Sequence, residues 1–148
     1  MRELSNIISG IAPSATLEIS DKARQMQRQG IDVISLSIGE PDFDTPAHIK
    51  EACIQALTCG ETHYAPSNGI PELLSAISRK TEQENKITCT PGQVIVTCGA
   101  KNAIYDAMVA VLNPGDEVII LDPSWVSYEP CVRMAGGKPV HHLLNSKT

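Results

Sequence analysis

The sequence contains few aromatic residues, no long apolar run and no excess of positive charge. Phe, Trp and Tyr together make up 3% of the 148 residues, whereas hydrophobic residues as a whole make up 42%, so the core must be built mainly from aliphatic side chains. No stretch approaches the ~18 apolar residues of a membrane span. The formal net charge of −5 argues against nucleic-acid binding, because such proteins usually carry a basic face.

The cysteines show no metal-binding pattern. There are five, irregularly spaced, and no CxxC pair occurs, so we predict no metal site and interpret them as small buried hydrophobic residues in a reducing compartment. The first ten residues, MRELSNIISG, carry charged and polar side chains where a signal peptide would be apolar. The predicted location is therefore the cytoplasm.

Apolar periodicity and turn residues predict an α/β fold. The first predicted helix begins at residues 14–16 and ends at residue 29. Further helices are predicted over residues 46–59, 100–112 and 126–135, and another begins at residue 71. The predicted strands cover residues 31–38, 94–98, 117–121 and 138–144. From residue 93 strands alternate with helices, which predicts a mostly parallel sheet flanked by helices on both faces. Three strands make a small parallel sheet, so we expect the sheet to be incomplete.

The segment VTCGAK joins a predicted strand to a predicted helix through small residues. The N–H groups and the dipole at a helix start favour an anion, and Gly99 allows a ligand to approach the backbone closely. Phosphate binding by the turn Gly99–Lys101 is one interpretation. An ordinary turn that binds nothing, with Lys101 in solvent, is the other. No GxGxxG or Walker loop is present, so nucleotide binding gains no support.

Trp125 is the only tryptophan, and it follows the predicted strand EVIIL. Ligands of open α/β sheets bind at the carboxyl edge of the strands, so the indole is a candidate for stacking on a flat aromatic cofactor. The alternative is a ring that covers the rim of the core. Tyr64 lies in the polar loop ETHYAPSNG, where it is either a packing residue or a ligand contact. The turn-rich segment GEPDFDTP by itself indicates a connection between domains.

Five segments occur in the order and spacing typical of one enzyme family. They are SIGEPDFDTP, HYAPSNGIPELLSAI, VTCGAKNAIYDAM, LNPGDEVIILDPSWVSY and AGGKPV. Together they resemble the class I (fold type I) pyridoxal-phosphate-dependent aminotransferases, most of all the prokaryotic aspartate aminotransferase-like branch. The resemblance runs from about Ile11 to the last residues. It implies an N-terminal arm and part of the small domain in residues 1–45, and the first part of the large cofactor-binding domain in residues 46–148.

The resemblance implies a cofactor-binding role for several residues. The backbone amides of Gly99, Ala100 and Lys101 would hold the phosphate of pyridoxal 5′-phosphate, and Trp125 would stack on its ring. Tyr64 would reach the phosphate in the neighbouring subunit, since the family forms its active sites at a homodimer interface. No catalytic residue is assigned within the chain.

The resemblance also implies substrate contacts. The backbone of Gly39 would contact the substrate α-carboxylate. The segment Ile11–Thr16 would border the substrate pocket, and its last residue, Thr16, would bind the substrate together with Trp125. In this branch Lys101 is also a candidate for binding the distal carboxylate of a dicarboxylic substrate. Its alternative role is that of a solvated lysine at a helix start.

Two departures from the family pattern affect the expected activity. Members that also use prephenate tend to carry Lys immediately before the Pro-Ser-x-Thr motif, where this chain has Ala12, and this argues against prephenate. The lysine that bonds the cofactor, an Asp facing the pyridine nitrogen and an Arg for the α-carboxylate belong to the part of the family that follows this segment. Ser146-Lys147 imitates the family's Ser-Lys pair, but it comes too early and lacks the following Gly and Arg.

The expected parent protein exchanges an amino group between an amino acid, of the aspartate or glutamate type, and a 2-oxo acid. The isolated chain is expected to be inactive and to be part of a homodimeric enzyme without nucleic-acid or membrane partners. A lyase or synthase of the same family stays open as an alternative. So does a non-catalytic module that binds the cofactor or a partner chain.

Overall fold

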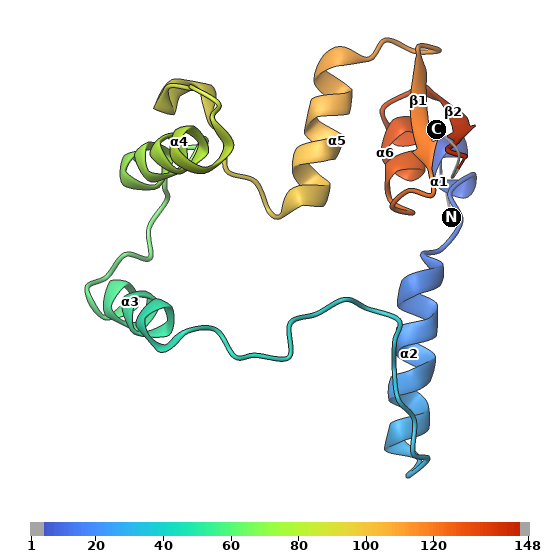
Figure 1. The fold of residues 1–148 in the computed structure, drawn as a ribbon, viewed down its shortest axis with the longest axis horizontal. Helices are drawn as coiled ribbons and strands as arrows, with labels where there is room; N and C mark the ends of the chain where they lie inside the picture. The colour runs from blue at the N-terminus through green and yellow to red at the C-terminus, as the bar shows by residue number, and fades with distance from the viewer. Residues whose placement is uncertain (1–4, 146–148) are drawn as a thin grey trace. The chain divides into compact units, whose positions relative to one another are not determined.

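The computed structural model describes residues 5–145 of the chain. Its helices and strands are labelled in Figure 1. In chain order they are α1 (Asn6–Ser9), α2 (Ala15–Arg28), α3 (Ala47–Thr58), α4 (Pro71–Asn85), the 3-10 helix η1 (Pro91–Gln93), α5 (Ala100–Val111), β1 (Glu117–Asp122), α6 (Tyr128–Met134) and β2 (Lys138–Leu143). The five longer helices and both strands lie within about two residues of their predicted positions, whereas α1 and η1 were not predicted.

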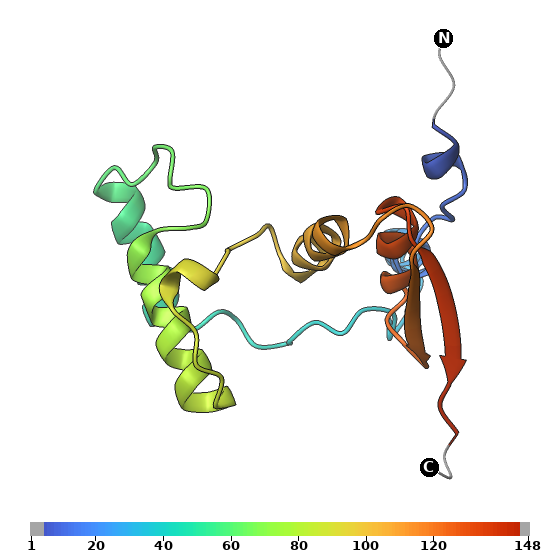
Figure 2. The same cartoon turned by 90° about the horizontal axis from the view of Figure 1, so that it is seen from above.

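The strands β1 and β2 form a parallel pair joined by α6 (Figures 1 and 2). The register runs from Glu117 opposite Lys138 to Asp122 opposite Leu143. Helix α6 packs against the face of the sheet that carries Ile120, and it buries Cys131 and Val132 almost completely. This βαβ unit confirms the predicted α/β class and the parallel pairing of these two strands.

Gly137 allows the chain to return closely from α6 into β2. A Cβ atom at this position would lie 3.0 Å from Leu112 Cδ1 and 3.0 Å from Val132 Cγ1. The backbone N–H of Gly137 donates to Val132 O at 2.9 Å, and that of the next residue, Lys138, donates to Asp116 O at 2.7 Å. A side chain at residue 137 would therefore push the end of α6 away from the sheet.

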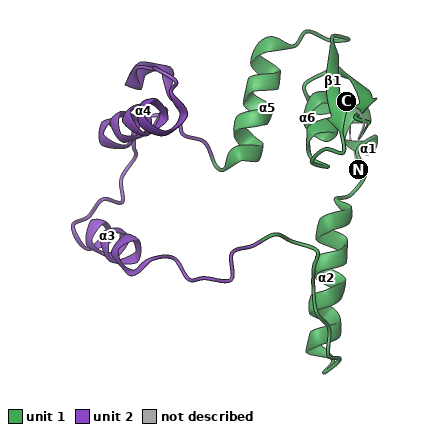
Figure 3. Ribbon diagram, viewed as in Figure 1, with its two compact units in different colours: residues 1–39, 98–148 green, residues 40–97 purple. Residues whose placement is uncertain are grey.

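The chain divides into two compact units (Figure 3). Unit 1 comprises residues 1–39 and 98–148, and unit 2 comprises residues 40–97. Unit 1 therefore contains α1, α2, α5, α6 and the strand pair, whereas unit 2 contains α3, α4 and η1.

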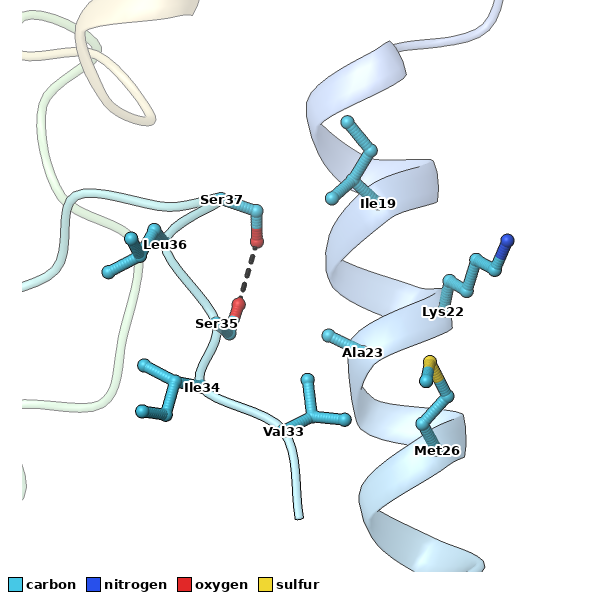
Figure 4. A pocket seen from close by; sticks show the side chains of 9 residues that line it. All are labelled: Ile19, Lys22, Ala23, Met26, Val33, Ile34, Ser35, Leu36 and Ser37. Atoms are coloured by element: carbon cyan, nitrogen blue, oxygen red, sulfur yellow. Dashed lines mark hydrogen bonds between the residues drawn. The ribbon is translucent and has the colours of Figure 1, made fainter. Parts of the chain in front are cut away.

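The predicted strand over residues 31–38 is wrong. This segment runs beside α2 without pairing to a strand (Figure 4), and a groove of about 440 Å³ separates the two. The side chains alternate as in a strand, since Val33 points toward α2 while Ile34 and Leu36 point away from it (Figure 4). The predicted alternation is therefore present, but none of the described residues supplies the neighbouring strand that a ladder needs.

The predicted strand over residues 94–98 is also wrong. Residues 91–93 form η1, and the N–H of Val96 donates to Asn68 O at 2.9 Å in the loop before α4. Gly69 of that loop allows this close approach, because a Cβ atom there would lie 3.0 Å from a methyl carbon of Val96. The apolar run VIVTC is thus bonded to a loop instead of a sheet in the described part of the chain.

Exposure of apolar and thiol side chains differs between the sheet and the helices. On the sheet face opposite α6, Ile119 is 70% and Leu121 is 53% exposed, which agrees with the predicted incomplete sheet. The cysteine interpretation holds for Cys131, which is buried, but fails for three others. These exposed thiols are Cys53, Cys59 and Cys98. None of the helices in residues 5–145 is long and apolar enough to cross a membrane.

Candidate functional site

The backbone turns sharply at Gly99, immediately before α5. Gly99 is the N-cap residue of α5 and has φ 86° and ψ 166°, a conformation that residues with a side chain rarely adopt. A Cβ atom built at Gly99 would meet nothing within 4 Å, so the space beside it is open. Ala100 and Lys101 form the first turn of the helix, where backbone N–H groups have no acceptor within the helix. The N–H groups of Ala100 and Lys101 are thus donors at a helix start, beside the open space at Gly99.

Trp125 lies three residues after the end of β1, at the carboxyl edge of the strand pair. Its side chain is 42% exposed, so part of the indole is accessible to a ligand. The ring of Tyr128 meets it edge-on, with centroids 5.6 Å apart and planes at 90°. The Nζ atom of Lys101 lies over the indole, 5.4 Å from its centroid. The start of α5 and the tryptophan are therefore neighbours within unit 1.

A cavity of about 660 Å³ lies beside this pair in unit 1. Its lining includes Ile11, Ala12, Lys101, Ser127, Glu129 and Arg133. Lys101 thus both lines the cavity and contacts the indole of Trp125. The guanidinium of Arg133 is paired with Glu129 at 2.8 Å, so the charge of Arg133 is already compensated. The segment that the resemblance assigns to the substrate pocket contributes residues 11–15 to this lining, whereas Thr16 is half-buried in the first turn of α2.

Two other predicted site residues lie elsewhere in the fold. Gly39 is exposed at the end of the first segment of unit 1, and a Cβ atom there would meet nothing within 4 Å. Tyr64 belongs to unit 2, in the loop between α3 and α4, and its side chain is fully exposed. The pair Ser146-Lys147 lies outside the described residues.

Sequence reasoning missed a cluster of charged side chains around His141. The Nδ1 atom of His141 lies 2.7 Å from Asp122 Oδ2, and its Nε2 atom lies 3.3 Å from Glu129 Oε2. Hydrogen bonding to the Asp122 carboxylate raises the pKa of His141 above its usual value. Hydrogen bonds from Ser124 and His141 lower the pKa of Asp122, and the bond from Arg133 lowers that of Glu129. The segment KPVHHLL signalled a strand, and nothing in it indicated which residues its histidines would meet.

The sequence model of the family "Aminotransferase class I and II" matches residues 31–147, which is most of the chain. The chain belongs to this family. It is 51% identical over 137 residues to the aspartate/prephenate aminotransferase of Thermus thermophilus, covering 93% of this chain and 36% of that protein. It is 47% identical over 142 residues to the aspartate aminotransferase of Bacillus sp. strain YM-2, covering 95% of this chain and 36% of that protein.

Solved aminotransferase structures share the fold of this chain. The aspartate aminotransferase of Thermus thermophilus with maleate superposes with a TM-score of 0.94 at 50% identity, over 97% of this chain and 37% of that one. The alanine aminotransferase of Pyrococcus furiosus superposes with a TM-score of 0.86 at 35% identity, over 95% and 36%. The chain therefore spans little more than a third of the length of these aminotransferases.

The family uses pyridoxal phosphate, and the residues around Gly99 and Trp125 suit that group. A phosphate ester needs hydrogen-bond donors and a favourable dipole, and the first turn of α5 has both. A pyridine ring needs a flat surface, and the indole of Trp125 is half-exposed close to that turn. The ammonium group of Lys101, 5.4 Å from the indole centroid, adds a positive charge to the surroundings of this site.

Proposed function

We propose that this chain supplies the cofactor-phosphate and ring-stacking part of a pyridoxal-phosphate-dependent aminotransferase. The enzyme would transfer an amino group between an amino acid of the aspartate or glutamate type and a 2-oxo acid. The observation that carries the proposal is the 5.4 Å separation between Lys101 Nζ and the Trp125 ring, because it places a helix start and an exposed indole within reach of one small molecule. When bound, the cofactor supplies the electron sink for the transfer.

The residues of this chain bind and orient, and they do not move the reacting proton. The amides of Gly99, Ala100 and Lys101 would donate to the phosphate oxygens, and the dipole of α5 would stabilise their charge. Stacking on Trp125 would fix the plane of the pyridine ring, while Tyr128 supports the indole from its edge. Holding both the phosphate group and the plane of the pyridine ring would leave one orientation for the reactive face of the cofactor.

Lys101 is the proposed determinant of substrate class. Lys101 lines the cavity of unit 1, where its ammonium would meet a second carboxylate of an acidic substrate. Gly39 would offer its backbone to the α-carboxylate, and Thr16 would close the pocket at the start of α2. Support comes from the solved Thermus relative, which was obtained with maleate, a dicarboxylate. Ala12 also lines the cavity. Because family members that use prephenate tend to carry Lys at this position, Ala12 favours aspartate over prephenate as the substrate.

The remaining assignments are proposals that rest on the resemblance to the family. We place the boundary between the N-terminal arm with the small domain and the large domain near residue 45. Tyr64 would act on the phosphate of the neighbouring subunit in a homodimer, and its complete exposure in this chain leaves it available for such a contact. The five free thiols suit a reducing compartment, which supports a cytoplasmic location.

Fluorescence of the single tryptophan tests the proposal directly. We would titrate the 148-residue chain with pyridoxine 5′-phosphate and with pyridoxine, which share the ring and lack the aldehyde that reacts with surface lysines. The phosphate ester should quench Trp125 at a concentration at least about tenfold lower, equivalent to roughly 1.4 kcal/mol of binding free energy. Equal quenching by both compounds, or no quenching by either, would contradict the phosphate site.

A further inference from the structure

The imidazole of His141 lies between two carboxylates from two different elements. Asp122 is the last residue of β1, and its Oδ2 is 2.7 Å from Nδ1. Glu129 is in the first turn of α6, and its Oε2 is 3.3 Å from Nε2. His141 itself is on β2, opposite Ile120 in the register. One side chain therefore connects both strands with the helix that joins them.

The two carboxylates flank the segment that carries Trp125. Residues 122–129, here called the Trp125 loop, run from the end of β1 to the first turn of α6. We propose that His141 is a positioning residue: its protonated ring clamps both ends of the Trp125 loop, and loss of the proton releases the Glu129 end and shifts the indole. The clamp is a property of this chain, whereas its effect on the cofactor rests on the function proposed above.

The proton requirement follows from the geometry. A protonated imidazole donates from both nitrogens, so it satisfies both carboxylates at once. A neutral ring has one donor, and the lone pair of its other nitrogen then faces a carboxylate oxygen. Because the Asp122 contact is the shorter one, the proton stays on Nδ1 and the Glu129 contact is lost. Solvent reaches the ring, since the side chain is 42% exposed, so the proton exchanges freely.

The charged groups around the ring determine when the proton leaves. Asp122 faces it from β1, and Glu129 faces it from α6 with Arg133 behind, paired to Glu129. The nearest charged pair along the strands, Lys138 with Glu117, lies at the other end of the sheet. The two carboxylates raise the pKa of His141, and the hydrogen bond to Asp122 contributes most. Release is therefore expected above the pH at which an ordinary histidine titrates.

Apart from the contact of Lys101 Nζ with the Trp125 ring, the other contacts hold the loop only locally. Ser124 donates to Asp122 at 2.9 Å, and the N–H of Tyr128 donates to Trp125 O at 3.1 Å. The backbone of Asp122 is also bonded to Leu144 N at 2.9 Å, so that end stays attached to β2 without the imidazole. The Glu129 end has no corresponding backbone bond to β2 among the described residues. Removing the clamp should thus move the loop without unfolding it.

The test uses the emission of Trp125, the only tryptophan, in the 148-residue chain between pH 5 and 9. The unsubstituted chain should show one transition with a midpoint above about 6.5, the usual pKa of histidine. His141→Gln should abolish the transition. The matched control is His142→Gln, because His142 lies opposite Leu121 on the other face of the sheet and should leave the transition unchanged. Far-UV circular dichroism of both variants checks that they fold.

A second measurement covers a variant that fails to fold. In proton NMR of the unsubstituted chain, the His141 ring proton and the Trp125 indole N–H should titrate with the same midpoint. The clamp would be overturned by a fluorescence transition that persists in His141→Gln. It would also be overturned by an indole N–H resonance that does not shift as His141 titrates. No cofactor is present in either measurement. A clamp that is seen without phosphate-dependent quenching would therefore contradict the proposed function and leave this inference standing.

Discussion

The Nζ atom of Lys101 lies 5.4 Å from the centroid of the Trp125 ring, although 24 positions separate the two residues in the chain. A cation over an exposed indole contributes roughly 0.5–1 kcal/mol, which is enough to bias the lysine side chain toward the ring. A flat ligand that stacks on the same face has to displace the ammonium. The displaced charge then becomes available to an anionic group of that ligand or of a second one.

Replacing Ala100 with proline tests the phosphate donors. Proline is well tolerated at the first position of a helix and removes one backbone N–H, so Ala100→Pro should keep α5 and lose one hydrogen bond to the phosphate. A hydrogen bond to a charged group contributes roughly 1.5–3 kcal/mol, so affinity for pyridoxine 5′-phosphate should fall at least about tenfold. Calorimetric titration measures this. Unchanged affinity with intact helicity would remove Ala100 from the site.

Trp125→Ala separates stacking from packing. By analogy with base–aromatic stacking, the variant should lose roughly 1–3 kcal/mol of cofactor binding, and Trp125→Phe should recover part of it. The fold should lose less than the roughly 3–5 kcal/mol typical of a buried aromatic residue, because the side chain is 42% exposed. Thermal melts and calorimetric titration give both quantities. A large stability loss with unchanged affinity would identify Trp125 as a packing residue.

The 148-residue chain by itself should not turn over substrates. The resemblance places the lysine that bonds the cofactor and the arginine that binds the α-carboxylate in the part of the family beyond the matched segment. Covalent catalysis requires an activated amine in that position. Incubation with aspartate, 2-oxoglutarate and pyridoxal phosphate should therefore give no more glutamate than a blank without protein. Glutamate formation above the blank would refute the assignment of roles.

Stability should depend on pH through the His141 cluster. The raised pKa of His141 means that its contribution is complete below about pH 6.5 and is lost as pH rises through the higher folded value. The lowered pKa values of Asp122 and Glu129 mean that their contributions are complete above about pH 4.3 and are lost as pH falls through the folded values. The melting temperature should be highest between these limits.

The variant His141→Gln should flatten mainly the alkaline side of that profile, since the carboxylates lose the imidazole but keep their partners Ser124 and Arg133. Calorimetric scans at intervals of half a pH unit resolve the difference. If the melting temperature of both proteins fell equally at alkaline pH, groups other than His141 would be responsible for the decline.

The sheet face opposite α6 should make the chain self-associate. Ile119 and Leu121 are largely exposed there, next to Val140 of β2, and exposed apolar strands promote association. Light scattering of the unsubstituted chain should show concentration-dependent oligomers. Ile119→Lys should reduce them, whereas Leu36→Lys, at a position that is 93% exposed outside the sheet, serves as the control. A monodisperse monomer at high concentration would contradict this.

Local signals predicted the local structure well. Periodicity located α2 to α6, Pro71 marked the start of α4, and the glycines at 136 and 137 marked the return into β2. The apolar segments EVIIL and KPVHHLL became a parallel pair because α6 connects them over a short distance. Residues 31–38 and 94–98 have similar strand character, but a strand also requires a partner. No partner is present among residues 5–145, and no local pattern reveals that.

The candidate site was predictable only in part. The position of Gly99 before a helix and of Trp125 after a strand could be read from the order of the elements. Their proximity depends on how α5 packs against α6, which is a tertiary contact. The cluster of His141 with Asp122 and Glu129 depends on the strand register and was therefore not visible in the sequence.

Nuclear magnetic resonance of the ¹⁵N-labelled chain tests the central assignment most directly. During a titration with pyridoxine 5′-phosphate, the backbone amides of Ala100 and Lys101 and the indole N–H of Trp125 should shift together with one midpoint. Amides in α4, which belongs to unit 2, should stay in place. Shifts confined to other residues, or separate midpoints for the helix start and the indole, would contradict a single site that holds both phosphate and ring.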